Sequence, residues 1–134
     1  MLLTNVELLK QFLQENDIQF FWPYEFICPH CNAVKIDSRV VLIVNELRQS
    51  LNKPVIITSA YRCPDYNKQI GGAKNSAHMK GLALDIAIPN SNYRFKVLEF
   101  LFKKGIRRIG IGKTFIHFDI DDTLPHPVVW HYYK

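Results

Sequence analysis

The seven residues 82–88 constrain the fold more than any other segment of the chain. Aliphatic side chains occupy every second position, at Leu82, Leu84, Ile86 and Ile88. Because side chains on a strand point alternately to its two faces, this period of two predicts a strand whose aliphatic face lies in the core. The opposite face carries Asp85 between Ala83 and Ala87. A strand packed on both faces more often carries large side chains there, so the alanines indicate open space beside the Asp85 carboxylate.

Other apolar patterns predict helices around this strand and further strands beside it. Helical spacing predicts helices at 4–16 with Thr4 as N-cap, 38–51 with Asp37 as N-cap and 93–104, with a short polar helix or turn at 63–70. Apolar and β-branched runs predict a central strand at 55–60 and two more at 107–111 and 115–120, joined by a hairpin-like 112–114. Helices and strands do not alternate strictly, so we expect an α+β fold with helices packed on a central antiparallel or mixed sheet.

The chain has the size and composition of one globular domain. It has 134 residues, 48% hydrophobic and 22% charged, and no repeat or linker-like run divides it. We therefore expect a single domain over 1–134, in which 1–23 form an N-terminal helix and an aromatic lead-in. The longest apolar runs, such as 40–44, are far too short to cross a bilayer, so we expect no membrane association.

The net charge of +5 suggests affinity for a polyanion, either nucleic acid or an anionic cell wall. The basic residues are scattered, and the dense patch among them consists of Lys103, Lys104, Arg107 and Arg108. Because such runs are common on protein surfaces, we interpret this patch as a solvated face without a partner.

The three cysteines cannot all pair within the chain, because their number is odd. Cys28 and Cys31 form a Cys-Pro-His-Cys unit that resembles half of a zinc knuckle or a redox motif. A structural zinc site would need two more ligands, which only Cys63 and a histidine remain to supply. The alternatives are cysteines that pack as small hydrophobic residues and, in an oxidising compartment, a disulfide from Cys63 to Cys28 or Cys31.

Two histidines and two carboxylates are the candidate residues for a metal centre. His78 precedes the strand that carries Asp85, and a turn at Gly81 can fold its side chain back toward that carboxylate. His117 and Asp119 are two residues apart on another predicted strand, so their side chains share one face. Two histidines and one carboxylate, His78, Asp85 and His117, would leave a fourth coordination position open, which is the arrangement of catalytic zinc sites.

Two further features would complete such a site. Arg62 follows Tyr61 just past the end of the predicted strand 55–60, where its guanidinium can hold a carboxylate or a developing oxyanion. The C-terminal residues 130–133, Trp-His-Tyr-Tyr, form an aromatic segment that can wall a cleft.

The order of these elements resembles the zinc D-alanyl-D-alanine carboxypeptidases and the related phage-type L-alanyl-D-glutamate endopeptidases. That family carries a Ser-Gly-Tyr-Arg-like element, a Gly-Gly pair and the pattern Ser-x-His-x-x-Gly-x-Ala-x-Asp. This chain has similar elements at 59–62, 71–72 and 76–85, and its residues 110–119 resemble the second-ligand strand of the family. The similarity extends over nearly the whole chain from residue 24, and the ordered set of elements is highly specific.

The resemblance implies that His78, Asp85 and His117 bind zinc and that Arg62 anchors the substrate or the transition state. It implies hydrolysis of amide bonds in the stem or cross-link peptides of peptidoglycan, on a DD-peptidase/Hedgehog-like fold. We expect a monomer with no nucleic-acid partner. The residues expected against the substrate are Arg62, Tyr61, Ser76 and Trp130.

One position departs from the pattern of this family. Several branches have an acidic general base three residues before the last zinc histidine, where this chain has Thr114. Asp119 is the candidate replacement because it shares a strand face with His117, and a buried carboxylate with a raised pKa can accept a proton. The equal alternative is that Asp119 orients the His117 ring. His126 and His131 are weaker candidates for the proton acceptor.

Two other functions stay open beside the peptidase. A catalytically silent wall-binding or phage structural module would keep the fold and the metal, and Thr114 is its main support. A nucleic-acid-binding zinc protein built on the three cysteines would use the positive charge, but it leaves the pattern over 57–119 unexplained.

The N-terminal residues lack the basic start, uninterrupted apolar stretch and cleavage site of a secretory signal. We therefore expect synthesis in the cytoplasm, action at the cell wall or in the periplasm, and a route outward that depends on another factor. A phage enzyme released by a holin, or a tail-associated component, fits this expectation.

Overall fold

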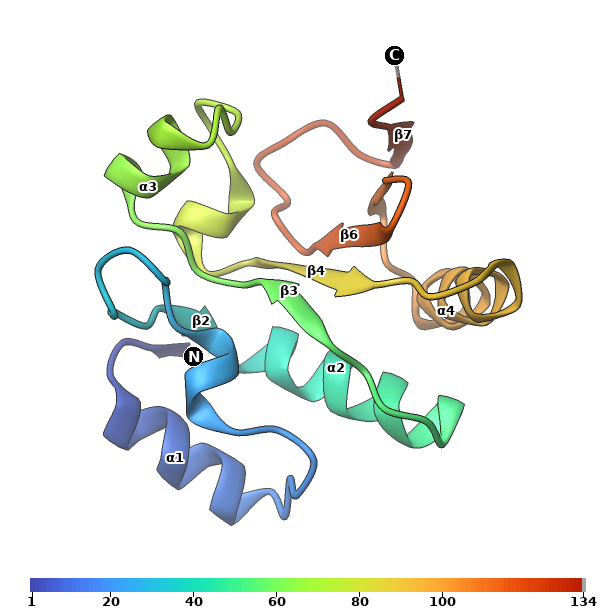
Figure 1. The fold of residues 1–134 in the computed structure, drawn as a ribbon. Coiled ribbons are helices and arrows are strands. Elements are labelled where there is room, and N and C mark those ends of the chain that lie inside the picture. Colours follow the sequence, from blue (N-terminus) through green and yellow to red (C-terminus); the bar gives the residue numbers. More distant parts are fainter. Residues whose placement is uncertain (134) are drawn as a thin grey trace.

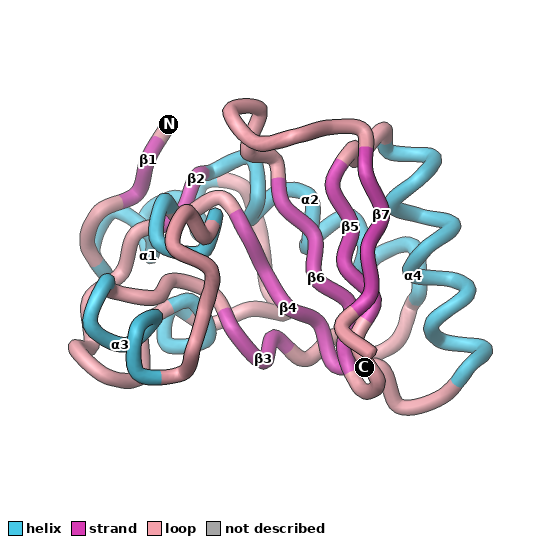
Figure 2. The backbone as a smooth tube through the Cα atoms, turned by 90° about the horizontal axis from the view of Figure 1, so that it is seen from above, coloured by secondary structure: helices cyan, strands magenta, loops and turns pink. Residues whose placement is uncertain are grey.

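The computed structural model describes residues 1–133 and contains a five-stranded sheet. From one edge to the other, its strands are β3 (Ile57–Ser59), β4 (Ala83–Ala87), β6 (Phe115–Asp119), β5 (Arg108–Ile111) and β7 (Val128–His131). Neighbouring strands are antiparallel except β5 and β7, which are parallel. Figure 2 shows the strands side by side in this order. The sheet is mixed, as expected.

Helices pack around this sheet, which confirms the α+β class. Within residues 1–133, the α-helices are α1 (Val6–Glu15), α2 (Ser38–Leu51), α3 (Pro64–Gln69) and α4 (Ser91–Lys104). Two 3₁₀ turns lie at Pro23–Phe26 and Ala77–Lys80. The short strands β1 (Leu2–Leu3) and β2 (Ile36–Asp37) pair as a separate antiparallel sheet. Figure 1 shows α2 beneath β3 and β4, with α3 above them. Among residues 1–133, no helix is both long and apolar enough to span a lipid bilayer.

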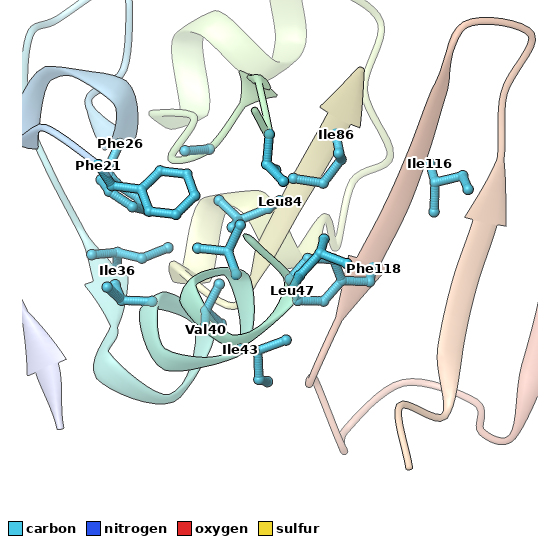
Figure 3. Packing of buried hydrophobic residues seen from close by; sticks show 14 of the residues in the cluster. Phe21, Phe26, Ile36, Val40, Ile43, Leu47, Leu84, Ile86, Ile116 and Phe118 are labelled. Carbon is cyan, nitrogen blue, oxygen red and sulfur yellow. The ribbon is translucent and has the colours of Figure 1, made fainter. Parts of the chain in front are cut away.

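The aliphatic face of β4 packs against α2 in the hydrophobic core. Leu84 and Ile86 are fully buried with Phe118 of β6 and Leu47 of α2. Figure 3 shows Leu84, Leu47 and Phe118 gathered between the sheet and the helix. Burying a side chain of this size stabilises the fold by roughly 1.5–3 kcal/mol. Because this face of β4 is fixed in the core, Asp85 points away from α2.

Some predicted boundaries are correct and others are not. Asp37 caps α2, because its carboxylate accepts a hydrogen bond from the Arg39 amide at 2.9 Å. The cap of α1 is Asn5 instead of Thr4, since the Asn5 side chain accepts a hydrogen bond from the Leu8 amide at 2.8 Å. The strand predicted as central at 55–60 is the edge strand β3, which pairs with β4 alone.

Candidate metal centre and cleft

The pairing of β4 with β6 brings Asp85 and His117 together. The two residues are direct partners in the antiparallel register, so their side chains lie on the same face of the sheet. His78 comes from the 3₁₀ turn Ala77–Lys80, where the Ser76 hydroxyl accepts a hydrogen bond from the His78 amide at 3.2 Å. All three expected metal ligands are buried on the open face of the sheet.

The donor atoms of these three residues converge on one point. Nε2 of His78 lies 3.1 Å from Oδ1 of Asp85 and 3.2 Å from Nδ1 of His117. The third side of the triangle, from Nδ1 of His117 to Oδ1 of Asp85, measures 2.9 Å. Two ligands bonded to one zinc ion at about 2.1 Å and a tetrahedral angle lie about 3.4 Å apart. The three atoms therefore fit one zinc ion with little movement.

The outer nitrogen of each ring is held by a hydrogen-bond acceptor. Nδ1 of His78 lies 2.6 Å from the carbonyl oxygen of Ala60, and Nε2 of His117 lies 2.7 Å from Oδ2 of Asp119. Carbonyl and carboxylate oxygens only accept, so each outer nitrogen carries a proton and donates it. In the neutral rings the inner nitrogens then carry lone pairs, and both face the Asp85 carboxylate. Three converging acceptors without a proton between them favour a cation at their centre.

Burial and hydrogen bonding act against each other on the pKa values of this cluster. Burial lowers the pKa of His78 more than the Asp85 carboxylate raises it, so this ring is neutral near pH 7 and able to bind a metal. Burial would raise the pKa of Asp85, but the close contacts with the His117 and His78 rings outweigh burial and hold the pKa low. Burial would lower the pKa of His117, but its contacts with Asp119 and Asp85 raise the pKa instead. A metal at His117 therefore competes with a proton.

Asp119 has both carboxylate oxygens engaged in the interior. Oδ2 accepts from His117, while Oδ1 accepts from Nε of Arg108 at 2.8 Å and from the amide of Asp121 at 3.1 Å. The residue is 1% exposed. A carboxylate held in this way fixes the tautomer and orientation of a histidine ligand. Of the two roles expected for Asp119, the geometry favours orientation of His117 over proton transfer.

Arg62 lies beside the cluster with its side chain 15% exposed. Nη2 donates to Oδ2 of Asp85 at 3.3 Å, and Nε donates to the Ser59 hydroxyl at 3.1 Å. These contacts hold the guanidinium in one orientation against the wall of the cleft. Nη1 also donates to Oδ1 of Asn67 at 3.4 Å, so two of the five N–H donors of the guanidinium remain for a bound molecule.

A cleft of about 400 Å³ opens over the cluster, and aromatic side chains form one wall. The centroid of the Trp130 ring lies 5.4 Å from that of the His117 ring and 6.3 Å from that of the Tyr132 ring. Gly110 makes room for this wall, because a Cβ at that position would lie 2.7 Å from Trp130 and 2.8 Å from Tyr132. Trp130 and Tyr132 of the C-terminal aromatic segment thus line the cleft.

Not every residue expected at the site lines this cleft. Ser76 lines it, whereas Tyr61 does not, so the geometry gives no support to the expected contact between Tyr61 and substrate. Thr114 also lies outside the lining. His126 and His131 are exposed and do not line the cleft, which places the two weaker candidates for a proton acceptor away from the cluster.

Arg108 is a residue of the site that the sequence assigns instead to the solvated basic patch. Its side chain is 13% exposed and forms an ion pair with Asp119 at 2.8 Å. The guanidinium carbon lies 4.9 Å from the centroid of the Trp130 ring. Arg108 is the direct partner of Asp119 in the register of β5 and β6, so the two residues share a face. The period of two along β5 is the signal that would have separated Arg108 from its basic neighbours.

Comparison with known proteins bears on this site. No curated protein matches the sequence. A family model described as Peptidase M15 matches residues 23–119, a range that contains β3, β4, β6 and all three expected metal ligands. Because this match covers well over half of the chain, the protein belongs to the peptidase M15 family, whose members are zinc-dependent peptidases.

Proposed function

We propose that this chain hydrolyses amide bonds in the stem or cross-link peptides of bacterial peptidoglycan, with zinc held by His78, Asp85 and His117. The observation that carries the proposal is the convergence of three donor atoms, each within 3.2 Å of the others, on the floor of an open cleft. Three protein ligands are typical of catalytic zinc, whereas structural zinc usually has four. Zinc bound there would polarise the scissile carbonyl and activate water as the nucleophile.

The residues behind the ligands prepare them for this role. The Ala60 carbonyl and the Asp119 carboxylate hold protons on the outer nitrogens of the two rings, so the inner nitrogens stay free for the metal. Arg108 holds Asp119 in place through its ion pair. The orientation of His117 is therefore fixed before any substrate arrives.

Two side chains of the cleft wall contact the peptide in this proposal. Arg62 offers N–H donors to a carboxylate of the substrate or to the oxyanion that forms at the attacked carbonyl. Burial raises the pKa of the Tyr132 phenol, so it keeps its proton at neutral pH. Because Thr114 supplies no carboxylic acid, we assign Tyr132 as a hydrogen-bond or proton donor to the reacting amide.

The charge of the protein supports peptidoglycan as the substrate. Stem peptides carry free carboxylates, which match the guanidinium of Arg62, and a net charge of +5 favours approach to an anionic wall. The resemblance of 57–85 and 110–119 to wall peptidases supports the same substrate class. The proposed partner is thus the wall, and not nucleic acid or a membrane, and the chain acts there as a monomer.

Purified sacculi test this proposal directly. The zinc-loaded protein should release new amino groups from sacculi, the His78→Ala variant should release none, and the exposed control His126→Ala should match the parent. Mass spectrometry of the muropeptides then identifies the bond and separates a carboxypeptidase from an endopeptidase. If zinc-loaded protein releases no amino groups from sacculi of any composition, the peptidase proposal is wrong.

A second candidate function is a silent module that binds the wall without cutting it. The observation in its favour is that, apart from Asp85 and Asp119, the described lining of the cleft contains no carboxylate to act as general base. This candidate predicts that the protein sediments with sacculi and that no amino groups appear. The same incubation therefore separates the two functions.

A further inference from the structure

The loop around Cys28 and Cys31 has the backbone of a metal-binding knuckle. The Cys28 amide donates to the Ala33 carbonyl at 2.8 Å, and the Asn32 amide donates back to the Cys28 carbonyl at 2.9 Å. Asn32 adopts a left-handed conformation with φ of 58°, which closes the turn directly after Cys31. The backbone amides of His30 and Cys31 point at the Cys28 sulfur. This tight turn presents the sulfurs of both cysteines to the same side.

A third cysteine joins this loop from a distant part of the sequence. Cys63 lies directly before α3, and its amide donates to the Cys28 sulfur at 3.5 Å. In Figure 1 the loop that follows Phe26 lies next to the chain that enters α3. The sulfurs of Cys28, Cys31 and Cys63 all lie within 4.8 Å of one another. Two sulfurs bonded to one tetrahedral zinc ion at about 2.3 Å lie about 3.8 Å apart, so a small contraction would bring all three onto one ion.

A histidine stands beside these sulfurs. Nδ1 of His30 lies 3.5 Å from the Cys63 sulfur, and the His30 ring stacks on Tyr66 of α3 with an interplanar angle of 16°. A neutral imidazole that adds to three thiolates gives the Cys₃His set of structural zinc sites. His30 is not part of the group whose donor atoms all lie within 4.8 Å of one another, so its ring would have to move to bind the same ion.

We propose that Cys28, Cys31, Cys63 and His30 form a second zinc site, which is structural and separate from the metal centre of the cleft. Thiolates are soft ligands that select zinc over magnesium or calcium, and four protein ligands close the ion to substrate. Cys31 is exposed and Cys63 is half-buried, so packing as small hydrophobic residues does not account for the cluster.

The ion would tie the N-terminal part of the chain to the substrate side of the cleft. Cys63 directly follows Arg62, whose guanidinium donates to Asp85 at 3.3 Å. Joining Cys63 to the 28–31 loop therefore fixes the backbone from which Arg62 extends. The second site does not depend on the proposed function, since it would hold the fold whatever the cleft binds.

The zinc content per chain of the purified protein tests the proposal. The parent should hold two zinc ions per chain, Cys31→Ser should lose one of them, His78→Ala should lose the other, and the double variant should hold none. Cys31 is exposed, so the serine variant should keep its fold, which circular dichroism verifies. Replacing zinc with cobalt should give intense sulfur-to-cobalt charge-transfer absorption in the parent and in His78→Ala, and none in Cys31→Ser. The His2Asp cluster has no sulfur and cannot give this signal.

The fourth ligand is tested with a matched pair of exposed histidines. Removing the His30 imidazole in His30→Ala should speed the loss of the thiolate-bound metal to a chelator by tenfold or more, while His126→Ala should match the parent. The proposal is overturned if the parent holds only the zinc that His78→Ala removes, if cobalt gives no thiolate absorption, or if the cysteines are found as a disulfide in fresh protein. Each of these results leaves the peptidase proposal standing, whereas inactive protein that holds both ions would refute the peptidase alone.

Discussion

The substitution Asp119→Asn separates the two roles that the sequence leaves open for this carboxylate. An aspartate accepts on both oxygens, and Asp119 uses them for His117 on one side and for Arg108 and the Asp121 amide on the other. An asparagine has one acceptor oxygen, which we expect to face the two donors, Arg108 and the Asp121 amide. Its NH₂ group then faces Nε2 of His117 and can only donate.

This reversal moves the proton of His117 to the wrong nitrogen. With Nε2 forced to accept, the neutral ring carries its proton on Nδ1, the atom that lies 2.9 Å from Oδ1 of Asp85 and should bind the metal. Removing the partner that orients a metal-bound histidine typically costs 10–100-fold in metal affinity or activity, or about 1.4–2.7 kcal/mol. We therefore expect zinc affinity at the cleft site to fall by that factor and peptide hydrolysis to fall with it.

The assay is competition for zinc with a chelator, measured on protein that also carries Cys31→Ser so that only the cleft site is counted. The matched control is Asp121→Asn, because Asp121 is equally buried at 1% exposure but pairs with Lys80 at 2.7 Å and touches neither histidine ring. The control should keep the parental zinc affinity. If Asp119→Asn binds zinc like the parent while hydrolysis falls by about 10²–10⁴-fold, Asp119 transfers protons and the orienting role is wrong.

Three further changes test other parts of the account. Arg62→Lys should lower kcat/KM by roughly tenfold or more, because an ammonium cannot reproduce the planar fork of the guanidinium, and unchanged steady-state kinetics would exclude Arg62 as the anchor. Tyr132→Phe should lower kcat while zinc affinity is unchanged, since it removes only the phenolic donor; an unaltered kcat would exclude that role. Asp37→Ala should cost about 1 kcal/mol of unfolding free energy at neutral pH, because it removes the cap of α2. Burial raises the pKa of Asp37, but Arg39 outweighs it and lowers the pKa, so this stabilisation is present at neutral pH and weakens as pH falls below the unfolded value of about 3.9. Urea titrations of the parent and of Asp37→Ala should show a smaller difference in unfolding free energy at acidic pH than at neutral pH. A larger difference at acidic pH would contradict the role of Asp37 as the cap of α2.

The sequence predicts the parts of this site that depend on one strand at a time. The alternation around Asp85 and the two-residue spacing of His117 and Asp119 each define a strand face without reference to any neighbour. The register that makes Asp85 the partner of His117 depends on how two strands pair, and no local pattern sets that pairing. The contact between Arg108 and Asp119 arises from pairing in the same way. The alternation along 108–111 can set Arg108 apart from its basic neighbours, but it does not identify Asp119 as its partner.

The edges of the sheet are the least predictable part of the fold. Residues 55–60 are as β-branched as a central strand, yet β3 lies at the edge of the sheet and pairs with β4 alone. β7 has no clear alternation, and it joins the sheet by pairing in parallel with β5. This pairing, which the sequence does not reveal, puts Trp130 over the His117 ring and turns an aromatic segment into a wall of the cleft.

Anomalous X-ray diffraction at the zinc absorption edge, from crystals of the zinc-loaded protein, tests the central claim most directly. We expect a peak about 2.0–2.2 Å from Nε2 of His78, Oδ1 of Asp85 and Nδ1 of His117, with no fourth protein ligand. An empty map at these three atoms, or an ion there whose fourth ligand is a cysteine, would contradict it.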